Sequence, residues 1–334
     1  FGVGLQGMDF FRGGDVVNNL VGVLEFAFGQ WRVRPTDSDP VAFAVTNTRT
    51  DQPAPVGGDL TVASFNVLNY FTTIDDGNPT CGPSGDLDCR GANSPSELTR
   101  QRAKIVSALA AIDADIVGLV ELENNASESL QSLIDGLNAV VGTGSYSYVD
   151  TGTIGTDAIK VGFIYKSATV MPAGAAAVLD SDAFVDPNNT GQPRNRPALA
   201  QTFEENGTGA LVTVVVNHLK SKGSGCGAGD DSPEDGQGNC NGTREAAALA
   251  LLDWLATDPT GSGDPDVLIT GDLNAYAKED PVSAILNAGY TDLISQFGGE
   301  TAYTFLFDGQ LGYLDHALAN STLAPQVTGA TEWH

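Results

Sequence analysis

The chain has 334 residues, of which 41% are hydrophobic, and its 42 acidic and 16 basic residues give a net charge of −26. This composition is typical of a globular protein with one large domain or two, and no apolar stretch approaches the roughly 20 residues that a membrane-spanning helix needs. The acidity argues against a sequence-specific DNA-binding protein, because contacts with phosphate dominate DNA affinity. It does not exclude a nuclease, which can confine its basic residues to one face and use a metal ion.

Residues 1–46 carry short alternating apolar runs, among them Val21-Gly22-Val23-Leu24 and Trp31-Arg32-Val33. These runs predict a β piece that is too small to bury a core alone, and we expect it to be the C-terminal tail of an upstream β-rich domain. Residues 47–58 are polar and rich in proline and glycine, which is typical of a linker. The main domain is therefore predicted over residues 59–334.

Strand-like and helix-like patterns alternate within this main domain. Ser94-Pro95-Ser96-Glu97 predicts a helix start, since it combines an N-cap serine, a proline at the first helical position and a capping-box glutamate. Further helices are predicted from Leu130 to Val141, after a cap at Thr243, and from Asp280-Pro281. Strand-like runs lie at 60–67, 115–121, 161–165, 211–218, 267–273 and 313–318. The alternation predicts a layered α/β fold.

Five apolar runs end in side chains that can bind a metal ion or a phosphate group. They close with Ser64-Phe65-Asn66, Gly118-Leu119-Val120-Glu121, Asn217-His218, Gly271-Asp272-Leu273-Asn274 and Tyr313-Leu314-Asp315. Several such runs in one chain predict strands that deliver carboxylates, amides and an imidazole to one rim. This combination suits metal-assisted phosphoester chemistry.

Asp272 and Asn274 follow a buried apolar run, and side chains two apart on a strand share a face. A carboxylate beside an amide can hold a water nucleophile and a phosphate oxygen together, which is the positioning that phosphoryl transfer requires. The alternative is a turn that closes the strand, because aspartate and asparagine are common turn residues. The place of the pair in the ordered series favours the functional interpretation.

Glu121 and His218 each end a strand-like run. An unpaired carboxylate at Glu121 would be unfavourable, so we expect a cation or a basic partner there, and its hard oxygen atoms favour Mg²⁺, Mn²⁺ or Ca²⁺ over zinc. The alternative is a glutamate that reaches solvent. His218 is followed by Lys220 and Lys222 in a chain poor in bases. This indicates a phosphate-facing loop, although a lone histidine at a strand end is more often structural.

The four cysteines fall into two local pairs, Cys81 with Cys89 and Cys226 with Cys240. Three connectivities are possible, and short-range pairing is the natural prediction. A zinc site is the alternative, but neither pair has the spacing of a zinc motif or a nearby histidine. Two disulfides would indicate an oxidising, extracellular or periplasmic environment. Between the second pair, residues 230–236 are acidic and are interpreted as a solvated loop, with a calcium site as the alternative.

Taken in order, the motifs at Asn66, Glu121, His218 and Asp272 resemble those of the endonuclease/exonuclease/phosphatase superfamily. The resemblance runs from about residue 59 to the end of the chain. Further segments resemble the secreted bacterial nucleases of the ExeM and NucH type; these are Arg102-Ala103-Lys104-Ile105, Cys81 and Cys89, Gly238 to Arg244, and Val327 to His334. The resemblance implies a DNase I-like fold, a four-layer α/β/β/α sandwich.

The same resemblance implies a role for each candidate residue. Asn66 and Glu121 would hold the metal ion, and Asp272 and Asn274 would serve the nucleophile and the phosphate. His218 would be an acid or a phosphate ligand. Arg196 would contact phosphate, and Lys160 is a further candidate for that contact.

The end of the chain departs from the family pattern. Members usually finish with a Ser-Asp-His strand whose histidine is the main general acid or base, and no Ser-Asp-His occurs here. Gly312-Tyr313-Leu314-Asp315 resembles the preceding strand, whose aspartate orients that histidine. We therefore expect Asp315 to be the orienting aspartate, and we expect the sequence to lack the last strand of the fold.

The leading hypothesis is a secreted or cell-surface nuclease that uses Mg²⁺ or Mn²⁺, with Ca²⁺ as an alternative, and cuts DNA with little sequence preference. RNA is an alternative substrate. Another enzymatic hypothesis is a phosphodiesterase or phosphatase that acts on lipid or small phosphate esters, because loops set substrate choice in a shared fold. A non-catalytic surface-binding module is the hypothesis from a different class.

Overall fold

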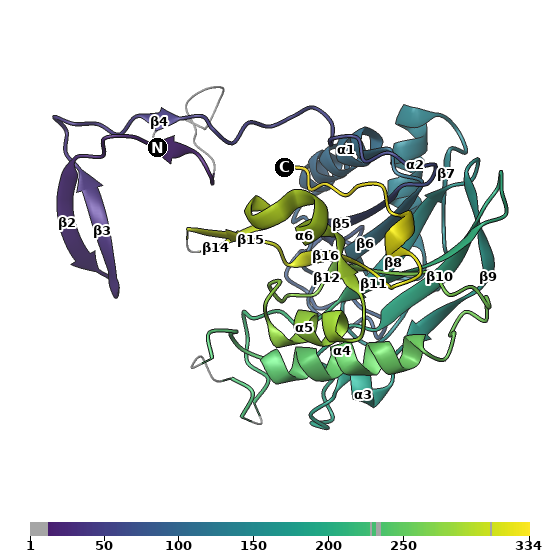
Figure 1. The fold of residues 1–334 in the computed structure, drawn as a ribbon. Coiled ribbons are helices and arrows are strands. Elements are labelled where there is room, and N and C mark those ends of the chain that lie inside the picture. Colours follow the sequence, from purple (N-terminus) through teal and green to yellow (C-terminus); the bar gives the residue numbers. More distant parts are fainter. Residues whose placement is uncertain (1–12, 228, 232–234, 308) are drawn as a thin grey trace. The chain divides into compact units, whose positions relative to one another are not determined.

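The computed structural model describes residues 13–227, 229–231, 235–307 and 309–334 (Figure 1). Its contacts divide the chain into two units. The first contains the residues up to Asp51 with Phe305–Leu311 and His334, and the second contains Gln52–Thr304 and Gly312–Trp333. The division at Asp51 falls within the predicted linker, 47–58. None of the helices among the described residues is both long and apolar enough to cross a membrane.

The first unit consists of short strands. β1 (Val16–Val17) pairs with β4 (Phe43–Ala44), and β2 (Gly22–Ala27) pairs with β3 (Gln30–Pro35), both antiparallel. β14 (Phe305–Phe307) and β15 (Gln310–Gly312) form another two-stranded sheet. Its apolar side chains are largely exposed, as at Phe26 (58%) and Trp31 (68%). Residues 1–12 of the predicted 1–46 segment lie outside the described residues.

The second unit contains two larger sheets. The first has the order β5-β6-β8-β7, with β5 (Val62–Tyr70) and β6 (Ile116–Glu123) parallel and β8 (Ile159–Lys166) and β7 (Tyr146–Tyr148) added antiparallel. The second has the order β13-β16-β12-β11-β10-β9. Its strands are β13 (Thr291–Asp292), β16 (Asp315–Ala319), β12 (Val267–Asp272), β11 (Leu211–His218), β10 (Ala198–Glu205) and β9 (Val170–Leu179). Among the described strands of this sheet, β11 and β12 are the only parallel neighbours.

Three hydrophobic clusters define the layers. Side chains such as Phe163 of β8 and Phe203 of β10 pack together between the two sheets. The outer face of the first sheet packs against α1 (Pro95–Ile112) and α2 (Glu128–Val141). The second sheet packs against the helices on its other face; these are α3 (Asp182–Val185), α4 (Asn241–Leu255) and α5 (Asp280–Asn287) (Figure 1). The predicted α/β/β/α arrangement is therefore confirmed.

The remaining helices are short. α6 (Leu293–Gly298) is followed by the 3-10 turn η2 (Gly299–Thr301), and η3 (Ala324–Gln326) lies near the C-terminus. α6 follows β13 directly and contacts β16. These elements therefore border the edge of the second sheet next to β16.

The helix starts agree with the sequence in one case and differ in another. α1 begins as predicted, because the Ser94 hydroxyl accepts the N–H of Glu97 at 3.4 Å and Pro95 occupies the first turn. α4 begins at Asn241, two residues before the predicted cap at Thr243. Thr243 lies inside the first turn, and the carboxylate of Asp230 accepts its N–H at 2.7 Å. A distant carboxylate thus provides the cap that we expected from the threonine.

Candidate active site

The ends of β5 and β6 bring Asn66 and Glu121 into contact. The Asn66 amide donates from Nδ2 to Oε1 of Glu121 at 3.1 Å, and the N–H of Asn69 donates to the other carboxylate oxygen at 2.9 Å. The pairing of β6 with β8 shifts between Leu119 and Leu122, and Glu121 has φ 67°. This left-handed conformation is unusual for glutamate and typical of residues held at functional sites.

The second sheet places His218, Asp272 and Asp315 on adjacent strands. His218 of β11 pairs in register with Asp272 of β12, and Asp272 pairs with Asp315 of β16. Nε2 of His218 lies 3.9 Å from Oδ2 of Asp272. Nδ1 of His218 is buried without a hydrogen-bond partner among the described residues. The imidazole therefore keeps a nitrogen available for a ligand.

The two sheets bring these groups into one electrostatic environment. Burial, and then the charge of Asp315, raises the pKa of Asp272 to about 8, and Glu121 contributes in the same direction. Burial also raises the pKa of Asp315, to which the charge of Glu121 again adds. Burial, followed by the charges of Arg196 and Arg90, holds the pKa of His218 well below 6.5. Three carboxylates and a neutral histidine thus converge at one rim.

Asn274 reaches this rim by a different path from the one predicted. β12 ends at Asp272, and Asn274 follows in a left-handed conformation with φ 48°. Its N–H donates to Oδ1 of Asp272 at 2.8 Å, and its side-chain amide donates to the carbonyl of Leu219 at 3.0 Å. A turn, rather than the shared face of one strand, therefore brings the two side chains together. Gly271 precedes this turn with φ 114°, and a Cβ there would overlap the carbonyl of Asn217.

Arg196 lies at the same rim. Its Nε donates to Oδ2 of Asp157 at 2.8 Å and its Nη1 to the carbonyl of Leu219 at 3.3 Å. Because a guanidinium has five N–H donors, others remain for an anion.

Lys160 does not have the surroundings of a phosphate contact. Its ammonium group is buried and donates to the carbonyls of Asn125 (2.7 Å), Ala126 (3.0 Å) and Gly152 (2.6 Å). These bonds use all three donors of the ammonium group. Burial lowers the pKa of Lys160 to about 8. The structure therefore supports a different role from the predicted one, in which Lys160 joins the loop after β6 to the loop before β8.

The donor atoms at Asn66 and Glu121 fit a hard divalent cation. Amide and carboxylate oxygens are the ligands that Mg²⁺ prefers, usually with one or two carboxylates and several waters. Burial raises the pKa of both Asp272 and Asp315, and the charges of Asp315 on Asp272 and of Glu121 on both raise them further, so a cation would offset negative charge here. Among the described residues, no three His, Cys, Asp or Glu side chains are grouped as a metal site. A cation here would therefore be held by the Asn66 amide oxygen and the Glu121 carboxylate, with water as the other ligands.

His316 does not belong to this site. It follows Asp315 on β16, is fully buried, and its Nε2 lies 2.8 Å from the carbonyl of Ala275. Successive side chains of a strand point to opposite faces, so Asp315 can face the rim only if His316 faces away. His316 therefore does not take the place of the Ser-Asp-His histidine, a motif that the sequence does not contain.

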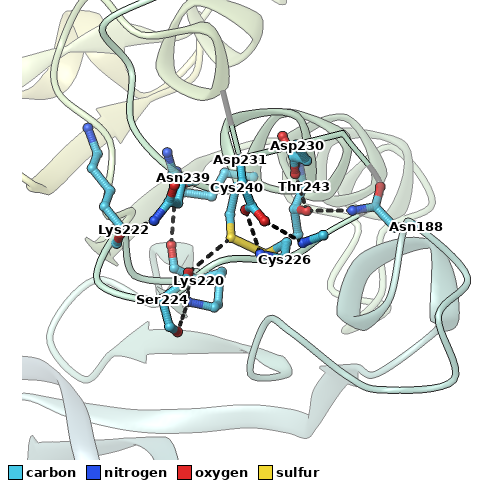
Figure 2. The surroundings of a disulfide bond; sticks show 12 residues. Asn188, Lys220, Lys222, Ser224, Cys226, Asp230, Asp231, Asn239, Cys240 and Thr243 are labelled. Carbon is cyan, nitrogen blue, oxygen red and sulfur yellow. Dashed lines mark hydrogen bonds between the residues drawn. A yellow bond between two sulfur atoms is a disulfide. The ribbon is translucent and has the colours of Figure 1, made fainter. Parts of the chain in front are cut away.

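Both predicted disulfides are present. Cys81 pairs with Cys89, and Cys226 pairs with Cys240 (Figure 2). There is no free cysteine among the described residues. The zinc alternative is therefore wrong for both pairs.

The acidic loop closed by Cys226 and Cys240 uses its described carboxylates internally. Asp231 accepts the N–H groups of Cys226 and Gly227, and Asp230 accepts those of Gly242 and Thr243 (Figure 2). Residues 232–234 lie outside the described residues. These hydrogen bonds favour a structural role for the loop over a calcium site.

Two residues near this rim, Arg90 and Asp157, were not predicted from the sequence. Arg90 donates from a terminal guanidinium nitrogen to Oδ1 of Asp157 at 2.9 Å, while Arg196 holds the other oxygen of the same carboxylate. Arg90 follows Cys89 directly, so its place beside a predicted disulfide could have indicated a basic side chain on a fixed backbone. Asp157 gave no signal, because its partners are distant in sequence.

Basic residues gather around this rim. Besides burial, the charges of Arg90 and Arg196 lower the pKa of His218, and those of Arg194, Arg196 and Arg244 lower the pKa of Lys220. With Lys222, which is also influenced by Arg244 and forms an ion pair with Glu279, the group contains six of the 16 basic residues of the chain. Lys220 and Arg244 are buried and donate to backbone carbonyls. Arg90 and Arg196 keep N–H donors beyond the acid that they share, so an anionic ligand would bind these two arginines.

Comparison with known proteins is consistent with this geometry. The model of the Endonuclease/Exonuclease/phosphatase family matches residues 63–333. No curated protein matches the sequence. One similar solved structure is an endonuclease/exonuclease/phosphatase family protein from Bacteroides thetaiotaomicron, 16% identical over 81% of this chain and 84% of that chain, with a TM-score of 0.51.

Two further similar structures are phosphatases. One is a mannosyl-6-phosphatase from Bacteroides thetaiotaomicron, 15% identical over 79% of this chain and 86% of that chain, with a TM-score of 0.51. The other is ANGEL2, a 2′,3′-cyclic phosphatase in complex with adenosine-2′,3′-vanadate, 11% identical over 78% and 84% with a TM-score of 0.51. At these identities the similarity shows the fold alone. The family match over most of the chain shows that this protein belongs to the endonuclease/exonuclease/phosphatase family.

Proposed function

We propose that the protein is a divalent-metal-dependent nuclease that hydrolyses phosphodiester bonds of DNA with little sequence preference, with RNA as an alternative substrate. The observation that carries this proposal is the convergence of Glu121, Asp272 and Asp315 with a neutral His218 beside Arg196. Such a site combines groups that accept protons with groups that bind phosphate oxygens.

Each side chain has a role in this proposal. In its ionised form Asp272 accepts the proton of the attacking water; its pKa is raised to about 8 without a cation, and a cation bound at Asn66 and Glu121 would lower it. Asn274 has one amide N–H on Leu219 and keeps the other for a phosphate oxygen. His218 donates an N–H to a phosphoryl oxygen, and Arg196 binds the same phosphate through its remaining donors. Asp315 keeps the pKa of Asp272 high and, by the family resemblance, orients a histidine.

Asn66 and Glu121 would hold Mg²⁺ or Mn²⁺. A cation bound there supplies stabilisation of negative charge on the phosphoryl oxygens. The contacts of Glu121 with the Asn66 amide and the Asn69 N–H fix the direction of its carboxylate. The chain thus prepares the ligand geometry through its own hydrogen bonds.

The charge of the rim supports a polynucleotide substrate, and the cysteines support an extracellular or cell-surface location. Two arginines that share one acid beside His218, Arg90 and Arg196, suit an anionic substrate such as a polynucleotide. Two disulfides suit an extracellular or cell-surface protein, as in the secreted ExeM and NucH nucleases that the sequence resembles.

A comparison of substrates tests this proposal. The protein at its full natural length would be incubated with plasmid DNA, RNA, phospholipid and small phosphate esters, in Mg²⁺ or Mn²⁺ and in chelator. We expect metal-dependent cleavage of the polynucleotides. Hydrolysis of lipid or small esters with intact DNA and RNA would favour a phosphodiesterase or phosphatase. No hydrolysis of any substrate would favour a non-catalytic binding module.

A further inference from the structure

Arg90 is held beside the candidate active site by an ion pair that it shares with Arg196. Oδ1 of Asp157 lies 2.9 Å from Arg90, and Oδ2 lies 2.8 Å from Arg196. The Arg90 side chain is 43% exposed, whereas that of Arg196 is only 12% exposed. One carboxylate thus joins the less exposed guanidinium of Arg196 to the more exposed guanidinium of Arg90.

The backbone at Arg90 is fixed on both sides. Cys89 is buried in a small apolar cluster with Phe71 and Ala158, and its disulfide to Cys81 closes the preceding loop. Gly91 lies so close to Phe71 that a Cβ at this position would overlap that side chain.

The same cluster also fixes the acid that pairs with Arg90. Ala158 is the residue after Asp157, and it packs in the cluster that contains Cys89. The arginine and its acid are therefore anchored by one piece of core.

Among the ion pairs of the described residues, Asp157 is the one acid that pairs with either arginine. Arg90 and Arg196 together carry two positive charges, and Asp157 carries one negative charge. Arg196, which shares Asp157 with Arg90, also donates to the carbonyl of Leu219, the residue after His218, so the shared ion pair holds Arg90 near the reacting groups. Exposed ion pairs contribute little to stability, so fold stability alone does not explain an anchored and exposed arginine in so acidic a protein.

We propose that Arg90 binds a second, non-scissile phosphate of the substrate strand, next to the phosphate bound at Arg196 and His218. Asp157 positions the guanidinium, and the free N–H donors of Arg90 meet the phosphate oxygens. The substrate class is therefore a polynucleotide with neighbouring phosphates. This inference rests on the proposed nuclease function and adds a strand-binding subsite to it.

The test compares Arg90→Gln with Arg100→Gln. Arg100 is a matched control, because it is also an exposed arginine paired with one acid, Glu97 on α1. Steady-state cleavage of a labelled oligonucleotide would be measured in Mg²⁺ between about 50 and 200 mM NaCl. Bis(p-nitrophenyl) phosphate, which has a single phosphate, would be measured in parallel, and thermal unfolding would confirm that each variant folds.

For Arg90→Gln we expect KM for the oligonucleotide to rise about tenfold, with little change in kcat. Its salt dependence should fall by about one unit in the log–log slope. Hydrolysis of the single-phosphate ester should be unchanged, and Arg90→Lys should recover part of the lost binding. Arg100→Gln should match the wild type with both substrates.

An unchanged KM and salt slope in Arg90→Gln would overturn the inference while leaving the nuclease function intact. An equal loss with the single-phosphate ester would also overturn it, because Arg90 would then act at the scissile phosphate or through the fold. If the wild type hydrolyses the ester but cuts no polynucleotide, the nuclease proposal and this inference both fail.

Discussion

His218 and Asp272 lie side by side in register on parallel strands, with Nε2 and Oδ2 3.9 Å apart. His218 is buried and Asp272 is partly buried, and burial acts on their pKa values in opposite directions. It lowers the pKa of His218 and raises that of Asp272, so near neutral pH the histidine is neutral and the aspartate retains its proton. Both shifts therefore favour the uncharged form of each side chain, so the stability of the fold should depend on pH.

We predict that the metal-free protein loses stability as the pH rises from about 6 to about 8.5. The folded-state pKa of Asp272 is about 8, above its ordinary value of 3.8, so over this range the folded state binds more protons than the unfolded state. Stability from such a group is complete at low pH and is lost as the pH rises through the folded pKa. Thermal unfolding in chelator would measure the trend.

Asp272→Asn should flatten this dependence, and Asp253→Asn, at an exposed position on α4, should leave it unchanged. Because a cation favours the ionised carboxylates, added Mg²⁺ should raise the melting temperature most at high pH. A steep dependence that persists in Asp272→Asn would show that another group is responsible.

Glu121→Gln should weaken Mn²⁺ or Mg²⁺ binding by about tenfold or more, because the substitution removes the charge of the proposed ligand. The effect on folding should be small, about 1 kcal/mol, since the side chain keeps its size and one acceptor oxygen. Isothermal titration would measure the affinity. Glu128→Gln, at an exposed position on α2, is the control. Equal affinities in the wild type and Glu121→Gln would remove Glu121 from the metal site.

Lys160→Met should lower the free energy of unfolding by about 3 kcal/mol, because three carbonyl groups lose a charged donor in a buried place. Chemical denaturation would measure the loss, with Lys104→Met on the exposed face of α1 as the control. A stability equal to that of the control would show that the three hydrogen bonds contribute little. Lys160 would then again be a candidate for phosphate binding.

Much of the rim could be predicted because each candidate ends an apolar run. Asn66, Glu121, His218 and Asp272 all lie at or near the ends of predicted strands, and adjacent strands bring them to one edge. Parallel pairing of β5 with β6 and of β11 with β12 then places the members of each pair together.

The rest depends on contacts that periodicity does not encode. The shift in β6 that redirects Glu121 and the left-handed turn at Asn274 are local irregularities, and a strand pattern predicts regular alternation instead. Lys160 was predicted to contact phosphate, because the sequence around a strand lysine does not indicate that three loop carbonyls will surround its ammonium group. β9 and β10 escaped prediction because their mixed alanine, glycine and polar residues give weak strand signals.

The most direct test of the account compares plasmid cleavage by the wild type and by Asp272→Asn, each at full natural length, in Mg²⁺ or Mn²⁺. Asparagine has nearly the same shape as aspartate but cannot accept the proton of the attacking water. We predict that Asp272→Asn cleaves at least about 10²-fold more slowly, while its melting temperature stays equal or rises. Cleavage by Asp272→Asn within a few-fold of the wild type would contradict the proposed role of Asp272 as the proton acceptor.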